Sequence, residues 1–377
     1  MADLGSHVGG WIEGLRALWA AVRRRFRRRG PRVPTRPVTV VPYLGYGVPS
    51  RIVLRGRVLE GDVARRAGEG DGPLQNLRNA YLRFETDELP GAAVEVSLAR
   101  RASVAVTVVT DAEGYFRAEL TPEPPAAVEG GAVPLRIRLL EPSVPAGGAI
   151  DVTGSAMVAG PAKRFVLLSD IDDTVLVTQA TRPWRVVRDA MFGNALTRRA
   201  FAGVAALYRA FEGAGALVSY VSSAPWNIYD LLQEFLVLND IPAGPMVLRD
   251  WGFGPGGGLP TRHMHHKVRE AEDLLDAFPP LPFVLLGDSG QEDPEIYAEL
   301  AKRHPERIAL ALIRDVGANE ARKQEIARQS EAAAEAGVPL VLVPDSVAAA
   351  AEAARHGWLP DAGVEDVRFA MEEAVRS

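Results

Sequence analysis

The spacing of hydrophobic residues changes twice along the chain, and each change predicts a different kind of element. In residues 11–29 apolar side chains recur every three or four positions, as in an amphipathic helix. Residues 37–158 contain short β-branched runs separated by Gly, Pro and Asp, which is typical of an all-β sandwich. From about residue 164, continuous apolar runs alternate with helical stretches. This pattern predicts a parallel sheet covered by helices on both faces.

The chain has 377 residues, more than one typical domain needs. The segment PRVPTRPVTVVP follows the first helix, and its prolines predict an extended linker. We therefore expect three parts. They are a basic helix with its linker in residues 1–36, a β-sandwich domain in residues 37–158, and an α/β domain in residues 160–377.

Composition excludes several classes of protein. The net charge of -5 argues against a protein that coats nucleic acid through bulk charge. Cysteine is absent, so the chain has no disulfide, thiolate metal site or cysteine nucleophile. No apolar run reaches the ~20 residues of a membrane-spanning helix.

The first predicted helix ends in a cluster of arginines: Arg23, Arg24, Arg25, Arg27, Arg28 and Arg29. An apolar stripe beside such a cluster favours binding to an anionic membrane surface. The same stripe would also serve to pack the helix on the protein itself, and both interpretations remain open. The charge follows the apolar stretch instead of preceding it, which argues against a secretory signal. We expect a cytoplasmic protein, with peripheral attachment at the inner membrane surface if the helix binds lipid.

In the α/β part, the apolar runs RFVLLSD, ALVSYVSS, PFVLLGD and IALALIRD all end in polar residues. The carboxyl ends of parallel strands meet at one edge of a sheet, where open α/β sheets place their ligand site. The first run continues into LSDIDDTVLVTQ, which holds Asp170, Asp172 and Asp173 in four positions. Such an acidic cluster at a strand end needs a cause, such as a metal ion or phosphate chemistry.

The spacing D-x-D-x-T at Asp170, followed by later strands ending in SS and GDSGQED, resembles the haloacid dehalogenase superfamily of phosphotransferases. The resemblance implies a three-layer Rossmann-like sheet, with Asp170 as nucleophile and Asp172 as general acid/base. The further implied residues are Thr174, Ser222, Ser223 and Lys267 for substrate binding, and Asp170, Asp172, Asp288 and Asp293 for Mg²⁺.

These residue types suit phosphoryl transfer. An ionised carboxylate attacks phosphorus without needing a base, and it forms an aspartyl-phosphate that water then cleaves. A hard cation between the two anions reduces their repulsion. A hydroxyl and an ammonium hold the phosphate oxygens, while a second carboxyl group transfers protons.

The motifs DIDDT, YVSSAPWN and FVLLGDSGQEDPEIY resemble more closely the catalytic domain of the actin-patch-protein family of Mg²⁺-dependent phosphatidate phosphatases. This resemblance implies hydrolysis of phosphatidate to diacylglycerol and phosphate. The chain lacks the long proline-rich tails of the fungal members and carries a predicted β-sandwich in front of the catalytic region.

Two alternatives stay open beside phosphatidate: a phosphatase for soluble phosphomonoesters or phosphoproteins, and a membrane-surface or protein-binding module with weak catalysis. We expect no large cap domain, so the site should admit a phosphate that projects from a bulky body. Trp184, Phe192 and Trp226 either line an apolar rim or pack the core, and core packing is favoured for each. His263, His265 and His266 suggest a polar loop rather than a zinc site.

The run VVTDAEGYFRAEL in the β part resembles the strand-turn-strand signature of transthyretin-like and immunoglobulin-like modules. We expect a hairpin whose glycine has a positive φ. Few catalytic residue types gather in this part, which favours a structural or docking role.

Overall fold

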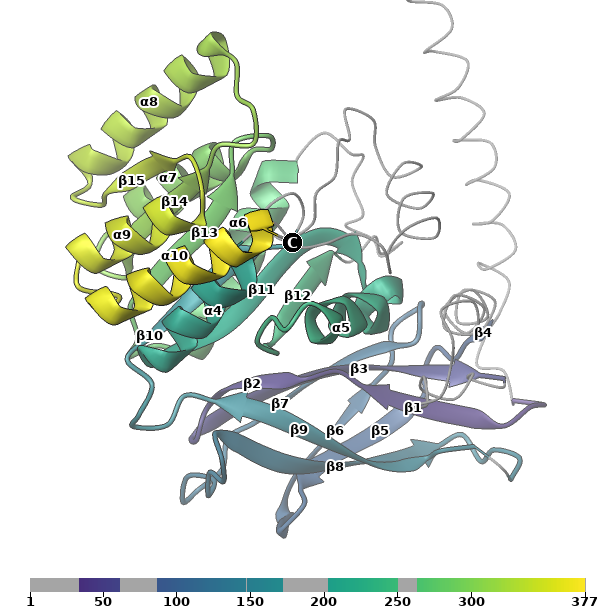
Figure 1. Ribbon diagram of the computed structural model, residues 1–377. Helices are drawn as coiled ribbons and strands as arrows, with labels where there is room; N and C mark the ends of the chain where they lie inside the picture. The colour runs from purple at the N-terminus through teal and green to yellow at the C-terminus, as the bar shows by residue number, and fades with distance from the viewer. Residues whose placement is uncertain (1–33, 62–86, 147, 172–202, 250–262, 377) are drawn as a thin grey trace, which may run out of the picture.

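The computed structural model describes residues 34–61, 87–146, 148–171, 203–249 and 263–376 (Figure 1). The predicted N-terminal helix lies outside these residues. In the part of the chain that is described, no helix is long and apolar enough to cross a membrane.

The first half of the described chain forms a β-rich unit (Figure 1). Its strands follow the order β1-β3-β2-β9-β8-β5-β6, and β4 and β7 also pair with β3. The bounds of the strands are β1 Val38–Pro42, β2 Gly45–Val48, β3 Arg51–Glu60, β4 Asp87–Glu88, β5 Ala93–Leu98, β6 Arg101–Val109, β7 Tyr115–Leu120, β8 Ala132–Glu141 and β9 Asp151–Val158.

Strands β7 and β8 bury every second residue, as a sheet with one apolar face requires. In β8 the buried positions are Val133, Leu135, Ile137 and Leu139. The expected β-rich character is confirmed. The end of the predicted linker is not extended coil, because its β-branched run Val38–Pro42 pairs with β3 as strand β1.

The predicted turn between β6 and β7 is present, but the predicted hairpin is wrong. Asp111 accepts backbone hydrogen bonds from Glu113 and Tyr115, and Gly114 has a φ of 76°. However, β6 pairs with β5 and β7 pairs with β3. A Cβ at residue 114 would lie 2.6 Å from the Val58 oxygen, so the turn packs against β3 and leads the chain to that strand.

The second half forms an α/β unit around a parallel sheet with strand order β12-β11-β10-β13-β14-β15. Its strands are β10 Phe165–Asp170, β11 Ala216–Pro225, β12 Met246–Arg249, β13 Phe283–Asp288, β14 Ile308–Arg314 and β15 Leu340–Val343. Its helices are α4 Val204–Gly213, η1 Trp226–Ile228, α5 Tyr229–Leu238, α6 His263–Ala277, α7 Asp293–Arg303, α8 Glu320–Glu335, α9 Ser346–Arg355 and α10 Asp361–Arg376.

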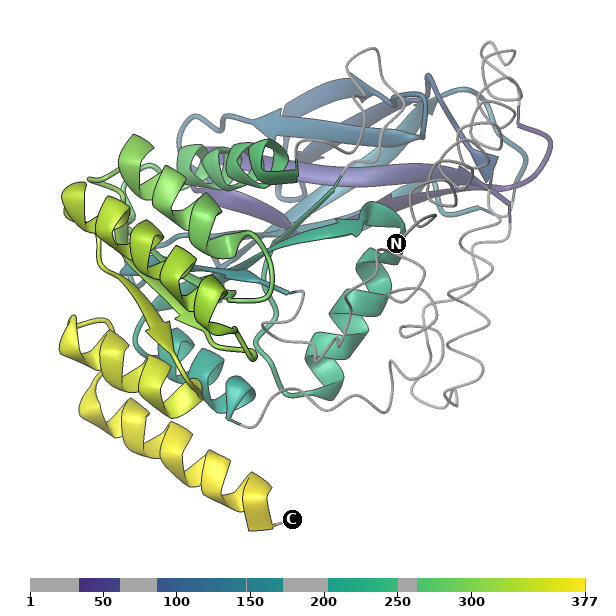
Figure 2. The same cartoon turned by 90° about the horizontal axis from the view of Figure 1, so that it is seen from above.

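Both faces of the parallel sheet are buried, as the continuous apolar runs predict. In β10, Phe165 and Leu167 belong to a core with helices α4, α5, α9 and α10, whereas Val166 and Leu168 belong to a core with α6, α7 and α8. Figure 2 shows these helices in separate layers on either side of the sheet. The predicted parallel α/β architecture is confirmed.

The order of the strands places the end of β10 near the centre of the edge that the carboxyl ends of the strands form. The chain passes from β10 outward to β11 and β12, and then returns to β13 on the other side of β10. A crevice forms at the carboxyl ends of the strands where the direction of winding reverses, and ligands bind there in open α/β sheets. The ends of β10 and β13 are Asp170 and Asp288.

Candidate active site

Three of the predicted carboxylates meet at the reversal point of the sheet. Asp170 ends β10, Asp288 ends the neighbouring strand β13, and Asp293 begins helix α7. All three are fully buried, and one oxygen of each lies within 4.8 Å of the others. Residues that are more than a hundred positions apart in sequence thus form one cluster.

Lys267 reaches this cluster from helix α6. Its Nζ lies 3.0 Å from Asp170 Oδ1 and 2.7 Å from Asp293 Oδ1. The lysine side chain is 7% exposed, so both ion pairs are shielded from water. Three carboxylates and one ammonium leave an excess of negative charge among these four side chains, and buried charge of this kind requires compensation.

The loop between β13 and α7 holds the carboxylates through backbone contacts. Asp288 Oδ1 accepts hydrogen bonds from the amides of Gly290, at 2.6 Å, and Gln291, at 3.1 Å. The Asp288 amide donates to Asp293 Oδ2 at 3.1 Å. A Cβ at Gly287 would lie 2.5 Å from Asp293 Oδ2, so only glycine lets the helix carboxylate approach the strand this closely.

The donor atoms of the cluster fit a hard divalent cation. They are all carboxylate oxygens, which Mg²⁺ prefers over nitrogen or sulfur ligands. The excess negative charge favours the same ion. A soft transition metal would call for thiolate ligands, and the sequence has no cysteine.

Ser222 lies on β11, the other neighbour of β10. Val221 pairs with Asp170, which places Ser222 one position beyond the level of the aspartate. The serine is fully buried, and its Oγ accepts a hydrogen bond from the Ala224 amide at 3.0 Å. Ser223 is half-buried. Asp172 and Thr174, the remaining predicted site residues, lie outside the described part of the chain.

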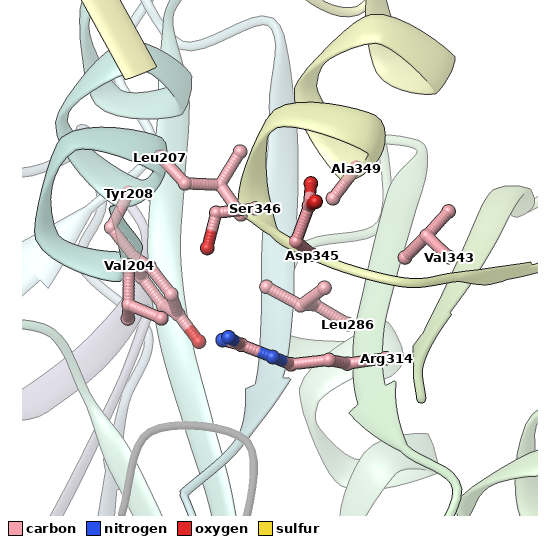
Figure 3. Close-up of a pocket in the computed structure, with 9 residues that line it drawn as sticks. All are labelled: Val204, Leu207, Tyr208, Leu286, Arg314, Val343, Asp345, Ser346 and Ala349. Atoms are coloured by element: carbon pink, nitrogen blue, oxygen red, sulfur yellow. The ribbon is translucent and has the colours of Figure 1, made fainter. Parts of the chain in front are cut away.

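Sequence reasoning assigned no role to Tyr208 or Arg314, which lie beside the strand ends. The Tyr208 hydroxyl hydrogen-bonds to Ser169 Oγ, next to Asp170. Figure 3 shows this hydroxyl and the Arg314 guanidinium pointing toward one another in a pocket that Asp345 and Ser346 also line. Burial raises the pKa of Tyr208 and lowers that of Arg314. Of these two residues, only Arg314 could have been picked out from the sequence, because it is a charged residue at the end of the apolar run in IALALIRD.

The expectations for His263 and Trp226 concern described residues and can be compared with the structure. The polar loop expected at His263 is wrong, because α6 begins at that residue; no Gly or Pro interrupts residues 261–277. Trp226 is only 5% exposed and stacks on Tyr43, so it packs in the core, as favoured above. Trp184 and Phe192 lie outside the described residues, as do parts of the two segments in which a cap would be inserted.

Comparison with known proteins gives matches to one catalytic region. Residues 165–315 match the family model described as phosphatidate phosphatase APP1, catalytic domain. An uncharacterized protein of Schizosaccharomyces pombe is 33% identical over 154 residues, and phosphatidate phosphatase APP1 of Saccharomyces cerevisiae is 30% identical over 149 residues. These alignments cover 40% and 39% of this chain, and the chain spans only 25% of the length of each relative.

Among solved structures, a haloacid dehalogenase family hydrolase from Deinococcus radiodurans aligns with 15% identity and a TM-score of 0.32. The alignment covers 52% of this chain and 98% of that one. The resemblance predicted from the sequence motifs is thus confirmed by the family match: residues 165–315, which hold Asp170, Ser222, Lys267, Asp288 and Asp293, are similar to the catalytic domain of the phosphatidate phosphatase APP1 family.

Proposed function

We propose that the chain is a Mg²⁺-dependent phosphomonoesterase of haloacid dehalogenase type that hydrolyses phosphatidate to diacylglycerol and phosphate. The observation that carries this proposal is the buried cluster of Asp170, Asp288, Asp293 and Lys267 at the reversal point of the sheet. The similarity of residues 165–315 to a phosphatidate phosphatase catalytic domain supports the same reaction.

In the proposed reaction Asp170 is the nucleophile. The Lys267 ammonium, 3.0 Å from Asp170 Oδ1, favours the ionised carboxylate and fixes its direction. One carboxylate oxygen attacks phosphorus while the bond to the leaving alkoxide breaks, which gives an aspartyl-phosphate. Asp172 gives its proton to the alkoxide and later takes one from the water that cleaves the aspartyl-phosphate.

The remaining residues hold the metal ion and the phosphate. We assign Asp170, Asp172, Asp288 and Asp293 to Mg²⁺, which when bound would offset the repulsion between the carboxylates and the phosphate. Ser222, Ser223, Thr174 and Lys267 are assigned to the phosphate oxygens. The amides of Gly290 and Gln291 fix Asp288, so this ligand is held in place before the ion binds.

Asp170→Asn should abolish turnover without unfolding the protein, because the amide keeps the shape of the side chain and loses its nucleophilic charge. We expect kcat to fall by at least ~1,000-fold, measured as phosphate release with Mg²⁺. Asp151→Asn is the matched control, since Asp151 is exposed and pairs with Arg136 on the β-rich unit. Residual activity of Asp170→Asn within tenfold of the parent protein would contradict a covalent mechanism at Asp170.

Gly287→Ala should weaken metal activation, because the added methyl group displaces Asp293 from its place against β13. The Mg²⁺ concentration for half-maximal activity should rise about 10- to 100-fold, as for other changes that move a metal ligand. Gly160→Ala is the control, since a Cβ there meets no atom within 4 Å. An unchanged Mg²⁺ requirement in Gly287→Ala would mean that Asp293 does not help to hold the ion.

The choice of phosphatidate as the substrate is more specific than the phosphatase assignment, and a direct comparison of substrates tests it. Catalytic efficiency should be at least about tenfold higher on phosphatidate vesicles than on glycerol phosphate or hexose phosphates at equal Mg²⁺, because remote binding contacts raise the rate of the chemical step. A preference for a small phosphomonoester, or for phosphoproteins, would replace the lipid assignment and leave the phosphatase assignment intact.

We further propose that residues 1–36 attach the protein to anionic membranes through the arginine cluster. Each arginine near such a surface contributes ~1 kcal/mol. Deleting residues 1–36 should therefore weaken binding to anionic vesicles and slow hydrolysis of phosphatidate in them, while activity on a soluble chromogenic phosphoester stays unchanged. An equal loss on both substrates would identify the segment as a structural support of the enzyme.

We keep the division into residues 1–36, 37–158 and 160–377 as a proposal, together with an immunoglobulin-like or transthyretin-like sandwich for the middle part. The separate hydrophobic core of the β-rich unit, which includes Val94, Leu135 and Ile137, supports that division.

A further inference from the structure

The β-rich unit contacts the α/β unit through aromatic rings next to the phosphate-binding segment. Tyr43, between β1 and β2, stacks on Trp226 with ring centroids 4.8 Å apart and an angle of 18° between the planes. The Tyr43 ring also lies 4.4 Å from the ring of Tyr229. The Leu44 amide donates a hydrogen bond to the Tyr229 hydroxyl at 2.9 Å. All three aromatic rings are buried, so this contact is a continuous part of the core.

Arg55, on β3, connects the same region to helix α6. Its guanidinium carbon lies 5.5 Å from the centre of the Trp226 ring, within the range of a cation–π interaction. The guanidinium also lies 3.5 Å from a carboxylate oxygen of Asp273 on α6. Helix α6 carries Lys267. Arg55 thus contacts helix α6, which carries Lys267, and Trp226 of η1, which directly follows strand β11 with Ser222.

The segment between Ser222 and Trp226 needs such support. The pairing of β11 with β12 shifts in register between Ser222 and Pro225, so the regular ladder does not determine the path of the chain there. The Ala224 amide turns back to the Ser222 hydroxyl. Trp226 follows directly, and its ring is held from the other unit by Tyr43 and Arg55. Ser222 itself pairs with Leu248 of β12, so Ser222 and Trp226 hold the two ends of the irregular residues 223–225.

We propose that Tyr43 and Arg55 are positioning residues, through which the β-rich unit aligns Ser222 and Lys267 with Asp170. This inference rests on the proposed phosphatase function, because it assigns the alignment to phosphate binding. It goes beyond a docking role for the β-rich unit. The α/β unit supplies all the reacting groups, yet the phosphate side of its site is fixed by side chains of the other unit.

The interface offers a matched control at Arg51, which lies on the same strand as Arg55. Arg51 donates a hydrogen bond to the Asp276 carbonyl near the carboxyl end of α6, at 2.9 Å, and pairs with Glu119. Asp276 lies more than two helical turns beyond Lys267 on α6, so this contact of Arg51 is far from the lysine. Arg51→Met thus removes an interface arginine of the same kind at a place remote from the phosphate-binding residues.

The experiment compares Arg55→Met, Arg51→Met, Tyr43→Leu and Tyr43→Phe in the full chain. Binding of inorganic phosphate in the presence of Mg²⁺ is measured by calorimetry, and kcat/KM and the half-activating Mg²⁺ concentration are measured beside it. Arg55→Met and Tyr43→Leu should weaken phosphate binding and lower kcat/KM by about tenfold, since small misplacements of binding groups are costly. Arg51→Met and Tyr43→Phe should stay within about twofold of the parent protein, because the Trp226 contacts are retained. The Mg²⁺ requirement should be unchanged in all four.

Equal phosphate affinity in Arg55→Met and the parent protein would overturn the inference. So would an equal loss in Arg51→Met, because both variants would then report only the general stability of the interface. A parent protein that binds phosphate but hydrolyses no ester would disprove the proposed function, while a selective loss of phosphate affinity in Arg55→Met would still support the positioning role. A parent protein that neither binds phosphate nor hydrolyses an ester would overturn both.

Discussion

The candidate site depends on one buried ion-pair network, in which the Lys267 ammonium lies between Asp170 and Asp293. Removing one partner of a buried pair costs about 3–5 kcal/mol, because the remaining charge stays without compensation. The negative charge of three carboxylates beside one lysine can be offset by a bound cation or by protonation of a carboxyl group. The carboxylate oxygens of the cluster are ligands that suit a hard cation, which agrees with the Mg²⁺ of the proposed function.

The architecture explains how residues distant in sequence form this network. Parallel strands end at the same edge of the sheet, and the chain winds in opposite directions on the two sides of β10. Asp170 and Asp288 thus end neighbouring strands, while α6 and α7 bring Lys267 and Asp293 to the same edge. The backbone amides after Asp288 hold its carboxylate, and the absence of a side chain at Gly287 lets Asp293 lie close to β13. These side chains lie on strand ends and helices, and only residues 289–292 separate β13 from α7.

The parts that sequence reasoning predicted are those encoded by local patterns. Polar residues at the ends of apolar runs predicted the parallel sheet and the edge at which a site should lie, whereas the resemblance to haloacid dehalogenases supplied Asp170, Ser222, Lys267, Asp288 and Asp293 as site residues. The parts that it missed depend on pairs of residues with no local signature. The contact of Tyr43 and Arg55 with Trp226 joins segments about 170 or more positions apart, and nothing near Tyr43 marks it as a partner of the catalytic region. The pairing of β7 with β3 was missed for the same reason, because a turn sequence predicts a change of direction and not the strand that follows.

The central claim is that Asp170 is the nucleophile of a site built from buried carboxylates and Lys267. Rapid acid quenching of the enzyme during turnover of a phosphate-labelled substrate with Mg²⁺, followed by peptide mapping, tests this claim most directly. The account predicts a hydroxylamine-sensitive phosphoryl group on Asp170. Stable labelling of another residue, or turnover with no phosphorylated enzyme at any quench time in a wild-type protein and in a variant slowed at Asp172, would contradict it.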